Sequence, residues 1–411
     1  MARSLALLAA VGVAVLAISS AAVAQTGLTI TADEAVNNFP DGITFSATVS
    51  ADEQITDIRL RYEVLPDGTA ASARPEFAPG TSAAVEVTLD EYLAPGTIIN
   101  YHWEVRAGGE TAESPEQSFF YDDIRFQWEK VEAGGLAVYH YTGDGDVAQA
   151  LLEVGAETVS ETEALLEVQV PFPINVWVYG SREDMVPALP RTSPTYEEQV
   201  VTLGVRIASD TVLVLGEVSY DTLRHELAHV VTAEAGDSAF GSLPAWLDEG
   251  TAVWAQRDKG GYGDAIEAAL DRGNVFSISE ITSSPGEASK VTLFYGQSWS
   301  IVQYLIDQSG SEKFAELFAE IKAGSTMDEA LEAAYGFDQI GLENEWRAAN
   351  GLPARATPEP TEPPQRTTAP QQTADEDGGT PTGMLIAVAA GVLALAAAVG
   401  FAGITLARRL G

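Results

Sequence analysis

The chain has 411 residues and 46% of them are apolar, so it is long enough to form two or three globular domains. Its 60 acidic residues against 22 Lys and Arg give a formal net charge of −38, which excludes nucleic acid as a partner because phosphate binding needs a basic surface. The absence of cysteine excludes disulfides, thiolate metal sites and thiol nucleophiles.

Residues 1–24 have the features of a secretory signal peptide. Arg3 supplies the positive start, an apolar stretch follows, and Ala22-Val23-Ala24 offers the small residues of a cleavage site. We therefore expect the mature chain to be exported.

Residues 27–122 are predicted to form an all-β domain. Three segments alternate apolar and polar residues, at 43–49, 57–64 and 98–105. Pro-Asp-Gly turns and a Pro-Gly turn separate these segments. Short strands with regular turns are typical of a β-sandwich of immunoglobulin or fibronectin type. His102 lies on one of the strands and is expected to be a packed or surface residue.

Residues 124–350 are predicted to form a second domain, which mixes strands and helices and then becomes mainly helical. Strands are expected at 136–141, 174–179 and 211–216. Helices are expected at 146–168, 219–235, 244–257, 262–272, 288–308, 311–323, 326–335 and 338–349. Gly236, Gly273 and Gly310 stand where helices are expected to end.

The C-terminal part of the chain predicts a membrane anchor. Residues 352–383 are rich in Pro, Thr, Gln and acids, which is typical of a disordered linker. Residues 384–407 are apolar and uncharged over a length that can span about 30 Å of hydrocarbon. Arg408 and Arg409 follow, and the positive-inside rule places the tail 408–411 in the cytoplasm. We therefore expect a single-pass protein of the cell membrane with its N-terminal ectodomain outside.

The segment from His225 to His229 reads His-Glu-Leu-Ala-His and fits the zinc-binding pattern His-Glu-x-x-His. Helix positions four apart face the same side, so both imidazoles can reach one ion. Glu226 lies beside them, where a carboxylate can take a proton from an attacking water. Ser219 or Asp221 can cap the start of this helix.

A downstream segment can complete the metal site. Pro244 can open a second helix, and Asp248 and Glu249 on it both offer the carboxylate that a three-ligand catalytic zinc site needs. Helical neighbours point about 100° apart, so only one of the two can face the metal. By chemistry alone, both acids are candidates.

His-Glu-Leu-Ala-His together with Trp-Leu-Asp-Glu-Gly-Thr-Ala at 246–252 resembles the gluzincin metallopeptidases. The similarity is closest to the peptidase MA-like group and more distant to the aminopeptidase-N type, and it covers residues 125–350. It implies an α+β gluzincin (thermolysin-like) catalytic domain with a mainly helical C-terminal half. It also implies one catalytic zinc ion, with Glu249 as the third ligand beside His225 and His229.

The resemblance implies two further features. Gluzincins use a downstream Tyr or His to stabilise the oxyanion, and no His follows His229, so a Tyr must serve. Tyr295 matches the expected position, with Tyr304 and Tyr262 as alternatives. The strand at 211–215 resembles the edge strand that pairs with extended substrate, although a core strand fits the same residues.

Two features depart from the family pattern. The chain lacks the Gly-x-Met-Glu-Asn motif with which the aminopeptidase-N type binds the free amine of its substrate, so aminopeptidase activity is not expected. Val253 stands where some gluzincins have an Asp that orients a zinc-bound His, and no other residue is predicted for that role.

The sequence therefore predicts a membrane-anchored, extracellular zinc peptidase that hydrolyses peptide or protein substrates by zinc-activated water. The alternative is a cell-surface adhesion or scaffold protein whose peptidase-like zinc domain is weakly active or inactive. The presence of Glu226 and all three ligand residues favours the enzyme. The substrate, the oligomeric state and the role of the β domain are left open.

Overall fold

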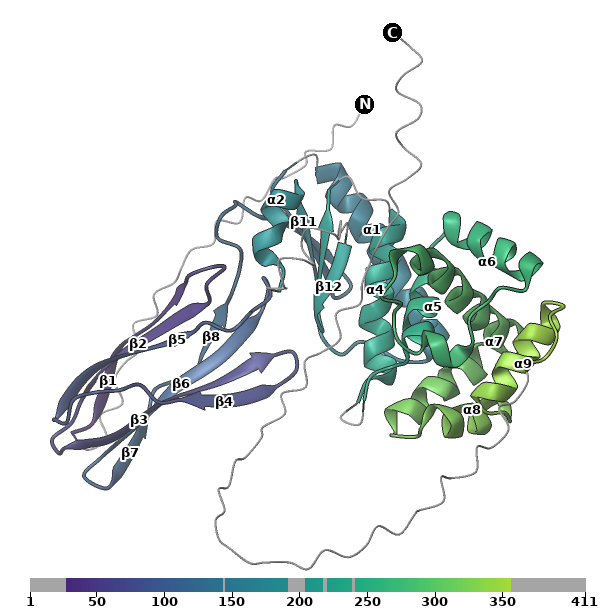
Figure 1. The fold of residues 1–411 in the computed structure, drawn as a ribbon. Helices are drawn as coiled ribbons and strands as arrows, with labels where there is room; N and C mark the ends of the chain where they lie inside the picture. The colour runs from purple at the N-terminus through teal and green to yellow at the C-terminus, as the bar shows by residue number, and fades with distance from the viewer. Residues whose placement is uncertain (1–26, 143–144, 191–203, 217–219, 239–240, 356–411) are drawn as a thin grey trace, which may run out of the picture. The chain divides into compact units, whose positions relative to one another are not determined.

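The structure is a computed structural model that describes residues 27–142, 145–190, 204–216, 220–238 and 241–355 (Figure 1). The predicted signal peptide, membrane span and tail lie outside these residues, as does most of the predicted linker. Within the described residues, no helix combines the length and the hydropathy that crossing a bilayer requires.

The chain divides into two compact units. The first ends at Ile124, and the second comprises residues 94–96 together with the chain from Arg125 onward. The first unit is β-rich, and the second combines a sheet with a helical C-terminal half, as the sequence predicted in outline. The finer assignment of the first unit to the immunoglobulin or fibronectin type stays a prediction.

The first unit contains two antiparallel sheets. One has the strand order β1-β2-β5 and the other has the order β4-β3-β6-β7, with β8 also paired to β6. The strands are β1 (Thr29–Asn37), β2 (Ile43–Ser50), β3 (Ile55–Leu65), β4 (Thr69–Ala73), β5 (Ser82–Leu89), β6 (Ile98–Ala107), β7 (Glu110–Glu113) and β8 (Gln117–Phe120). Alternate residues are buried along β2, so one face of its sheet packs on the core.

The second unit has a five-stranded sheet in the order β12-β13-β11-β10-β9. Its strands are β9 (Glu129–Ala133), β10 (Leu136–His140), β11 (Ile174–Tyr179), β12 (Gly204–Ala208) and β13 (Thr211–Leu215). Strands β10, β11 and β13 run parallel, while β9 and β12 pair antiparallel at the two ends. Helix α1 (Gly145–Leu166) connects β10 to β11 and packs on the sheet.

Of the two interpretations of residues 211–215, an edge strand and a core strand, the structure supports the core strand. β13 lies between β11 and β12, so both of its edges are paired and its apolar residues are buried. Among the described residues, β12 is the strand at this edge of the sheet. A run of consecutive apolar residues is typical of an interior strand. The strand order, in which β12 pairs with the outer side of β13, leaves β12 at the edge of the sheet.

The helices of the second unit begin and end close to the predicted residues. After the short α2 (Arg182–Met185) they are α4 (Tyr220–Gly236), α5 (Ala245–Ala255), α6 (Gly261–Arg272), α7 (Ala288–Lys322), α8 (Met327–Tyr335) and α9 (Gln339–Ala349). α7 spans both helices expected on either side of Gly310, where the backbone leaves helical geometry with φ 83° and ψ 171°. The break that the glycine predicted is therefore present as a kink.

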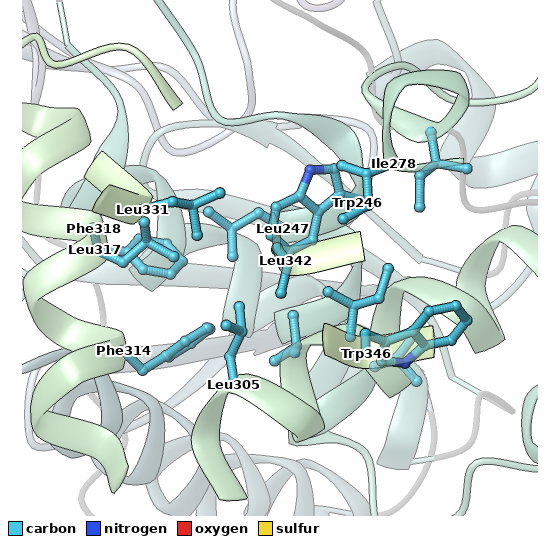
Figure 2. Close-up of a cluster of buried hydrophobic side chains, with 14 of the residues drawn as sticks. Trp246, Leu247, Ile278, Leu305, Phe314, Leu317, Phe318, Leu331, Leu342 and Trp346 are labelled. Carbon is cyan, nitrogen blue, oxygen red and sulfur yellow. The ribbon is translucent and has the colours of Figure 1, made fainter. Parts of the chain in front are cut away.

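The C-terminal helices share one apolar core, which fixes α5 in place (Figure 2). Trp246 and Leu247 of α5 are fully buried among side chains of α7, α8 and α9. A Cβ at Gly250 would lie 2.5 Å from the carbonyl oxygen of Ser298, so α5 and α7 approach closely only because this residue is glycine. Glu249 directly precedes Gly250, so the packing of α5 against α7 also sets the position of Glu249.

Candidate metal centre

Helix α4 carries three of the predicted site residues into the protein interior. His225, Glu226 and His229 are 5%, 3% and 3% exposed. On another side of the helix, Leu223 and Leu227 pack with the sheet and α1. The spacing of four residues places both histidines on the face that meets α5.

The ligand atoms of His225, His229 and Glu249 converge. The two Nε2 atoms are 3.2 Å apart, and Oε2 of Glu249 lies 3.1 Å from Nε2 of His225 and 3.4 Å from Nε2 of His229. Ligands about 2.0–2.1 Å from a tetrahedral zinc ion are about 3.3 Å from one another. Among the described residues, these three form the only group of His, Asp and Glu side chains arranged to hold a metal ion.

Two buried carboxylate oxygens also indicate a cation. Oε2 of Glu249 and Oε1 of Glu226 have no hydrogen-bond partner within the described part of the chain, although the two imidazoles flank Oε2. A buried anionic oxygen without a partner costs free energy, which a bound cation removes. Two imidazoles and one carboxylate are also a ligand set that zinc uses in catalytic sites. The residues present therefore fit a zinc ion.

Asp248 is not one of the three converging ligands, but it contacts one of them, His229. Its Oδ1 lies 2.9 Å from Nδ1 of His229 and accepts a hydrogen bond of 2.5 Å from the hydroxyl of Thr232. An Nδ1–H that donates to a carboxylate leaves the Nε2 lone pair free for a metal. The structure thus separates the roles of the two neighbouring acids, with Glu249 facing the centre and Asp248 orienting His229.

Gln256 lies beside Nδ1 of His225, as Asp248 lies beside Nδ1 of His229. Its carboxamide lies 3.1 Å from Nδ1 of His225, and Gln256 is 9% exposed. The carboxamide atom at this distance is Nε2 of Gln256. When Nε2 of His225 faces a metal, Nδ1 carries the proton, and a flip of the carboxamide presents its oxygen as the acceptor. The sequence analysis missed this residue. The spacing could have indicated it. Gln256 follows Glu249 by seven residues, which is close to two helical turns, so the two side chains lie on nearly the same side of α5.

The carboxylate of Glu226 is held by one oxygen only. Its Oε2 accepts a hydrogen bond of 3.0 Å from the backbone N–H of Arg206 on β12, while Oε1 is the oxygen without a partner. A Cβ at Gly204 would lie 3.2 Å from Cγ of Glu226, so the glycine allows β12 to approach α4 closely. This contact places the edge strand beside the predicted general base.

Tyr295 lies near the centre, as the family resemblance implied. Its ring centroid is 5.8 Å from that of His225 and 5.2 Å from that of Tyr262, and Tyr295 is 2% exposed. Burial, and then the negative charge of Glu249, raise the pKa of both hydroxyls, so both stay protonated and able to donate. Tyr304 packs at the margin of the helical core, where the nearby carboxylate is Glu345 rather than a site residue.

The charges at the centre favour a cation. Burial opposes a charged imidazole at His229, but the carboxylates of Asp248 and Glu249 outweigh burial and raise its pKa. Burial would raise the pKa of Asp248, but the attraction of His229 lowers it to about 2, and the pKa of Glu249 is lowered in the same way. The acids therefore remain ionised in the interior.

Of the two residues predicted to cap α4, the structure describes only Asp221. Ser219 lies outside the described residues, and the carboxylate of Asp221 accepts hydrogen bonds from the backbone N–H groups of Arg257 and Asp258. Asp221 therefore joins α4 to the loop after α5, because a carboxylate in the first turn is also within reach of neighbouring segments.

A comparison with protein families identifies the region that contains this centre. Residues 155–350 match the family described as the Peptidase MA superfamily. This region is similar to the Peptidase MA superfamily, as the two sequence motifs predicted. The match includes α4, α5 and α7, and so all of the predicted ligands, the general base and Tyr295. It confirms the resemblance on which Glu249 was assigned.

Solved structures that resemble the chain include an M1 zinc metallopeptidase from Deinococcus radiodurans bound to a Tyr-Ser-Ala substrate, which is 13% identical over 82% of this chain and 92% of that chain, with a TM-score of 0.35. An aminopeptidase N family protein from Idiomarina loihiensis is 12% identical over 78% of this chain and 73% of that chain, with a TM-score of 0.29. At these TM-scores neither likeness bears on function. A search of curated proteins finds no match.

Proposed function

We propose that the Peptidase MA region is a zinc-dependent peptidase that hydrolyses peptide bonds, with Glu226 as its general base. One observation carries the proposal. The ligand atoms of His225, His229 and Glu249 converge within 3.4 Å of one another, next to a buried carboxylate with one oxygen free. The match of residues 155–350 to the Peptidase MA superfamily supports the same chemistry.

The roles of the residues follow from their contacts. A zinc ion held by the three ligands would polarise the scissile carbonyl and lower the pKa of water. Oε1 of Glu226 takes the proton of the attacking water and passes it to the leaving amine, while the hydrogen bond from Arg206 holds Oε2 in place. Tyr295 is the proposed hydrogen-bond donor to the oxyanion of the substrate.

We propose that the substrate lies along β12. This strand is at the sheet edge among the described residues, and the N–H of Arg206 on it donates to Glu226. A peptide that pairs with this edge would pass the carboxylate that removes the proton from water. This assigns to β12 the substrate-pairing role that was one of two interpretations of residues 211–215.

We also propose that the peptidase acts outside the cell, anchored by its C-terminus. The support comes from the sequence. Residues 1–24 resemble a signal peptide, residues 384–407 are apolar and long enough to span a bilayer, and Arg408 and Arg409 follow them. The linker at 352–383 would then separate the peptidase from the membrane.

Metal analysis and a cleavage assay on the full-length protein test the proposed function. We expect one zinc ion per chain, and cleavage of a mixed peptide library that a chelator abolishes and added zinc restores. Cleavage that survives complete removal of metal would refute the proposal. Stoichiometric zinc without any cleavage would instead support the surface scaffold.

A further inference from the structure

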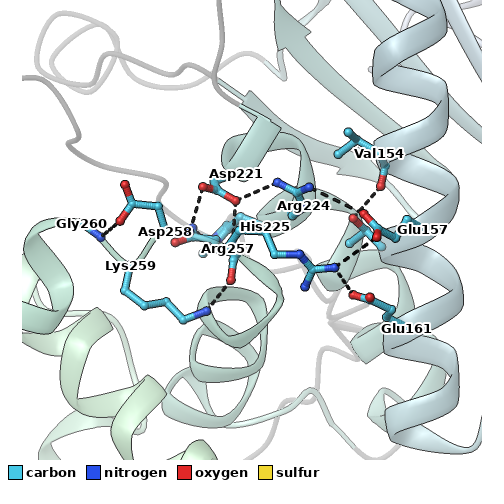
Figure 3. Close-up of polar contacts among 12 residues, drawn as sticks. Val154, Glu157, Glu161, Asp221, Arg224, His225, Arg257, Asp258, Lys259 and Gly260 are labelled. Carbon is cyan, nitrogen blue, oxygen red and sulfur yellow. Dashed lines mark hydrogen bonds and ion pairs between the residues drawn. The ribbon is translucent and has the colours of Figure 1, made fainter.

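The loop between α5 and α6, residues 256–260, is tied to α4 by the carboxylate of Asp221 (Figure 3). The backbone N–H of Arg257 donates to Oδ1 of Asp221 at 2.7 Å, and the backbone N–H of Asp258 donates to Oδ2 at 3.1 Å. Two successive N–H groups on one carboxylate fix both the position and the orientation of this segment.

The same carboxylate is itself held in place. The guanidinium of Arg224 donates to Oδ1 of Asp221 at 3.0 Å, and the side chain of Arg224 is 11% exposed. The guanidinium of Arg257 reaches Glu161 on α1 at 2.6 Å. Helices α1 and α4 therefore hold the loop from two sides, as Figure 3 shows.

The end of α5 is closed by Lys259. Its ammonium group donates to the carbonyl oxygens of Trp254 and Gln256, and it lies 5.7 Å from the centroid of the Trp299 ring. A cation at the C-terminus of a helix satisfies carbonyls that have no partner within the helix. Gln256 is thereby fixed through its own carbonyl and through the N–H of the residue that follows it.

These contacts converge on the ligand His225. The side chain of Gln256 lies 3.1 Å from Nδ1 of His225, and Asp221 precedes His225 by four residues on α4, so both lie on one helix face. Asp221 and His225 are both on α4, and the contacts from Asp221 to the loop and from Gln256 of the loop to His225 therefore begin and end on the same helix. Rotation of the imidazole would require this closed set of contacts to open.

We propose that Gln256 and Asp221 are positioning residues for the metal centre: Gln256 sets the orientation of His225, and Asp221 holds the loop that presents Gln256. The inference rests on the proposed zinc site. In some gluzincins an Asp at the position of Val253 orients a zinc-bound His. The proposal assigns this orienting role to the α5–α6 loop. Partners of this kind change metal affinity by about 10- to 100-fold when they are removed.

Zinc affinity of the full-length protein, measured by competition with a chromophoric chelator, tests the proposal without reference to catalysis. We expect Gln256→Met to weaken zinc binding by about 10- to 100-fold. Asp221→Asn should weaken it less, because asparagine retains one acceptor oxygen. Gln256→Glu restores an acceptor for Nδ1–H and should bind zinc more tightly than Gln256→Met. The visible spectrum of the cobalt-substituted protein should change in the Met and Asn variants.

Asp328→Asn is the matched control. Asp328 also accepts two hydrogen bonds with one carboxylate, at 3.1 and 2.9 Å from the backbone and side chain of Gln339, but it joins α8 to α9. It should lower the stability of the metal-free protein about as much as Asp221→Asn and leave zinc affinity unchanged. Equal loss of affinity in both variants, or wild-type affinity in Gln256→Met and Asp221→Asn, would overturn the proposal. Absence of zinc binding by the unmodified protein would refute the proposed function itself.

Discussion

Glu104 of the first unit and two buried acids of the second unit, Glu226 and Glu249, have different partners. In the first unit Glu104 is 7% exposed and pairs with Arg61 at 3.0 Å and Arg106 at 2.8 Å. In the second unit Glu226 and Glu249 are 3% and 2% exposed, and no arginine or lysine side chain within the described residues forms an ion pair with them. Their partners are imidazoles and one backbone N–H.

The difference distinguishes a carboxylate in a structural ion pair from the two acids that we propose act at a metal centre. Burial is similar in both units, so burial alone does not indicate a site. Glu104 has its countercharges on its own and a neighbouring strand, and the arrangement is complete without a ligand. The two acids of the second unit lack such countercharges, and a cation would supply the missing charge.

The largest expected effect is on catalysis. Glu226→Gln should lower kcat by about 10²- to 10⁴-fold, because the amide cannot take the proton from the attacking water. Zinc content should stay at the wild-type value, since Glu226 is not one of the three converging ligands. Glu104→Gln makes the same chemical change in the first unit and should leave kcat unaltered. A Glu226→Gln variant that cleaves peptides at the wild-type rate would remove the proposed role.

The next effect is on stability and its dependence on pH. Zinc should stabilise the protein by about 4 kcal/mol when free zinc is about 1,000 times the Kd. Without metal, the raised pKa of His229 contributes stability that is complete below about pH 6.5 and is lost as the pH rises through that pKa. Zinc needs the neutral imidazole, so its stabilisation grows over the same range.

Thermal unfolding with zinc and with a chelator, compared between about pH 5 and pH 8, measures this effect. The difference in Tm between the two conditions should increase with pH. A difference that is constant, or that falls as the pH rises, would contradict a site built from these imidazoles. The Glu104→Gln variant should show the same increase, because it leaves the metal centre unchanged.

The smallest expected effect is in the first unit. The hydrogen bond from Arg61 is the main cause that lowers the pKa of Glu104, with Arg106 adding to it. Stability from a lowered pKa is present above about pH 4.3 and is lost as the pH falls through the folded-state value. Glu104→Gln should cost about 1 kcal/mol at pH 7 and less at pH 3, measured by urea unfolding. A larger loss at the lower pH would show that the pairing is not electrostatic.

Local patterns in the sequence determined several features directly. The spacing of His225 and His229 defines a helix face, and glycines at 236, 273 and 310 lie where helices end or kink. Each of these features depends on residues within a few turns of one another. Glu249 could be assigned because its segment resembles those of a known family, not because of the spacing alone.

Only the tertiary structure decided how the segments combine. It placed β12 rather than β13 at the sheet edge, and it gave Asp248 and Gln256 to the two imidazoles and Asp221 to the loop after α5. These are contacts between segments distant in sequence, set by how α4, α5 and the sheet pack. The residues Asp248 and Glu249 show the limit most clearly, because neighbours with the same chemistry differ only in the direction in which the packed helix points them.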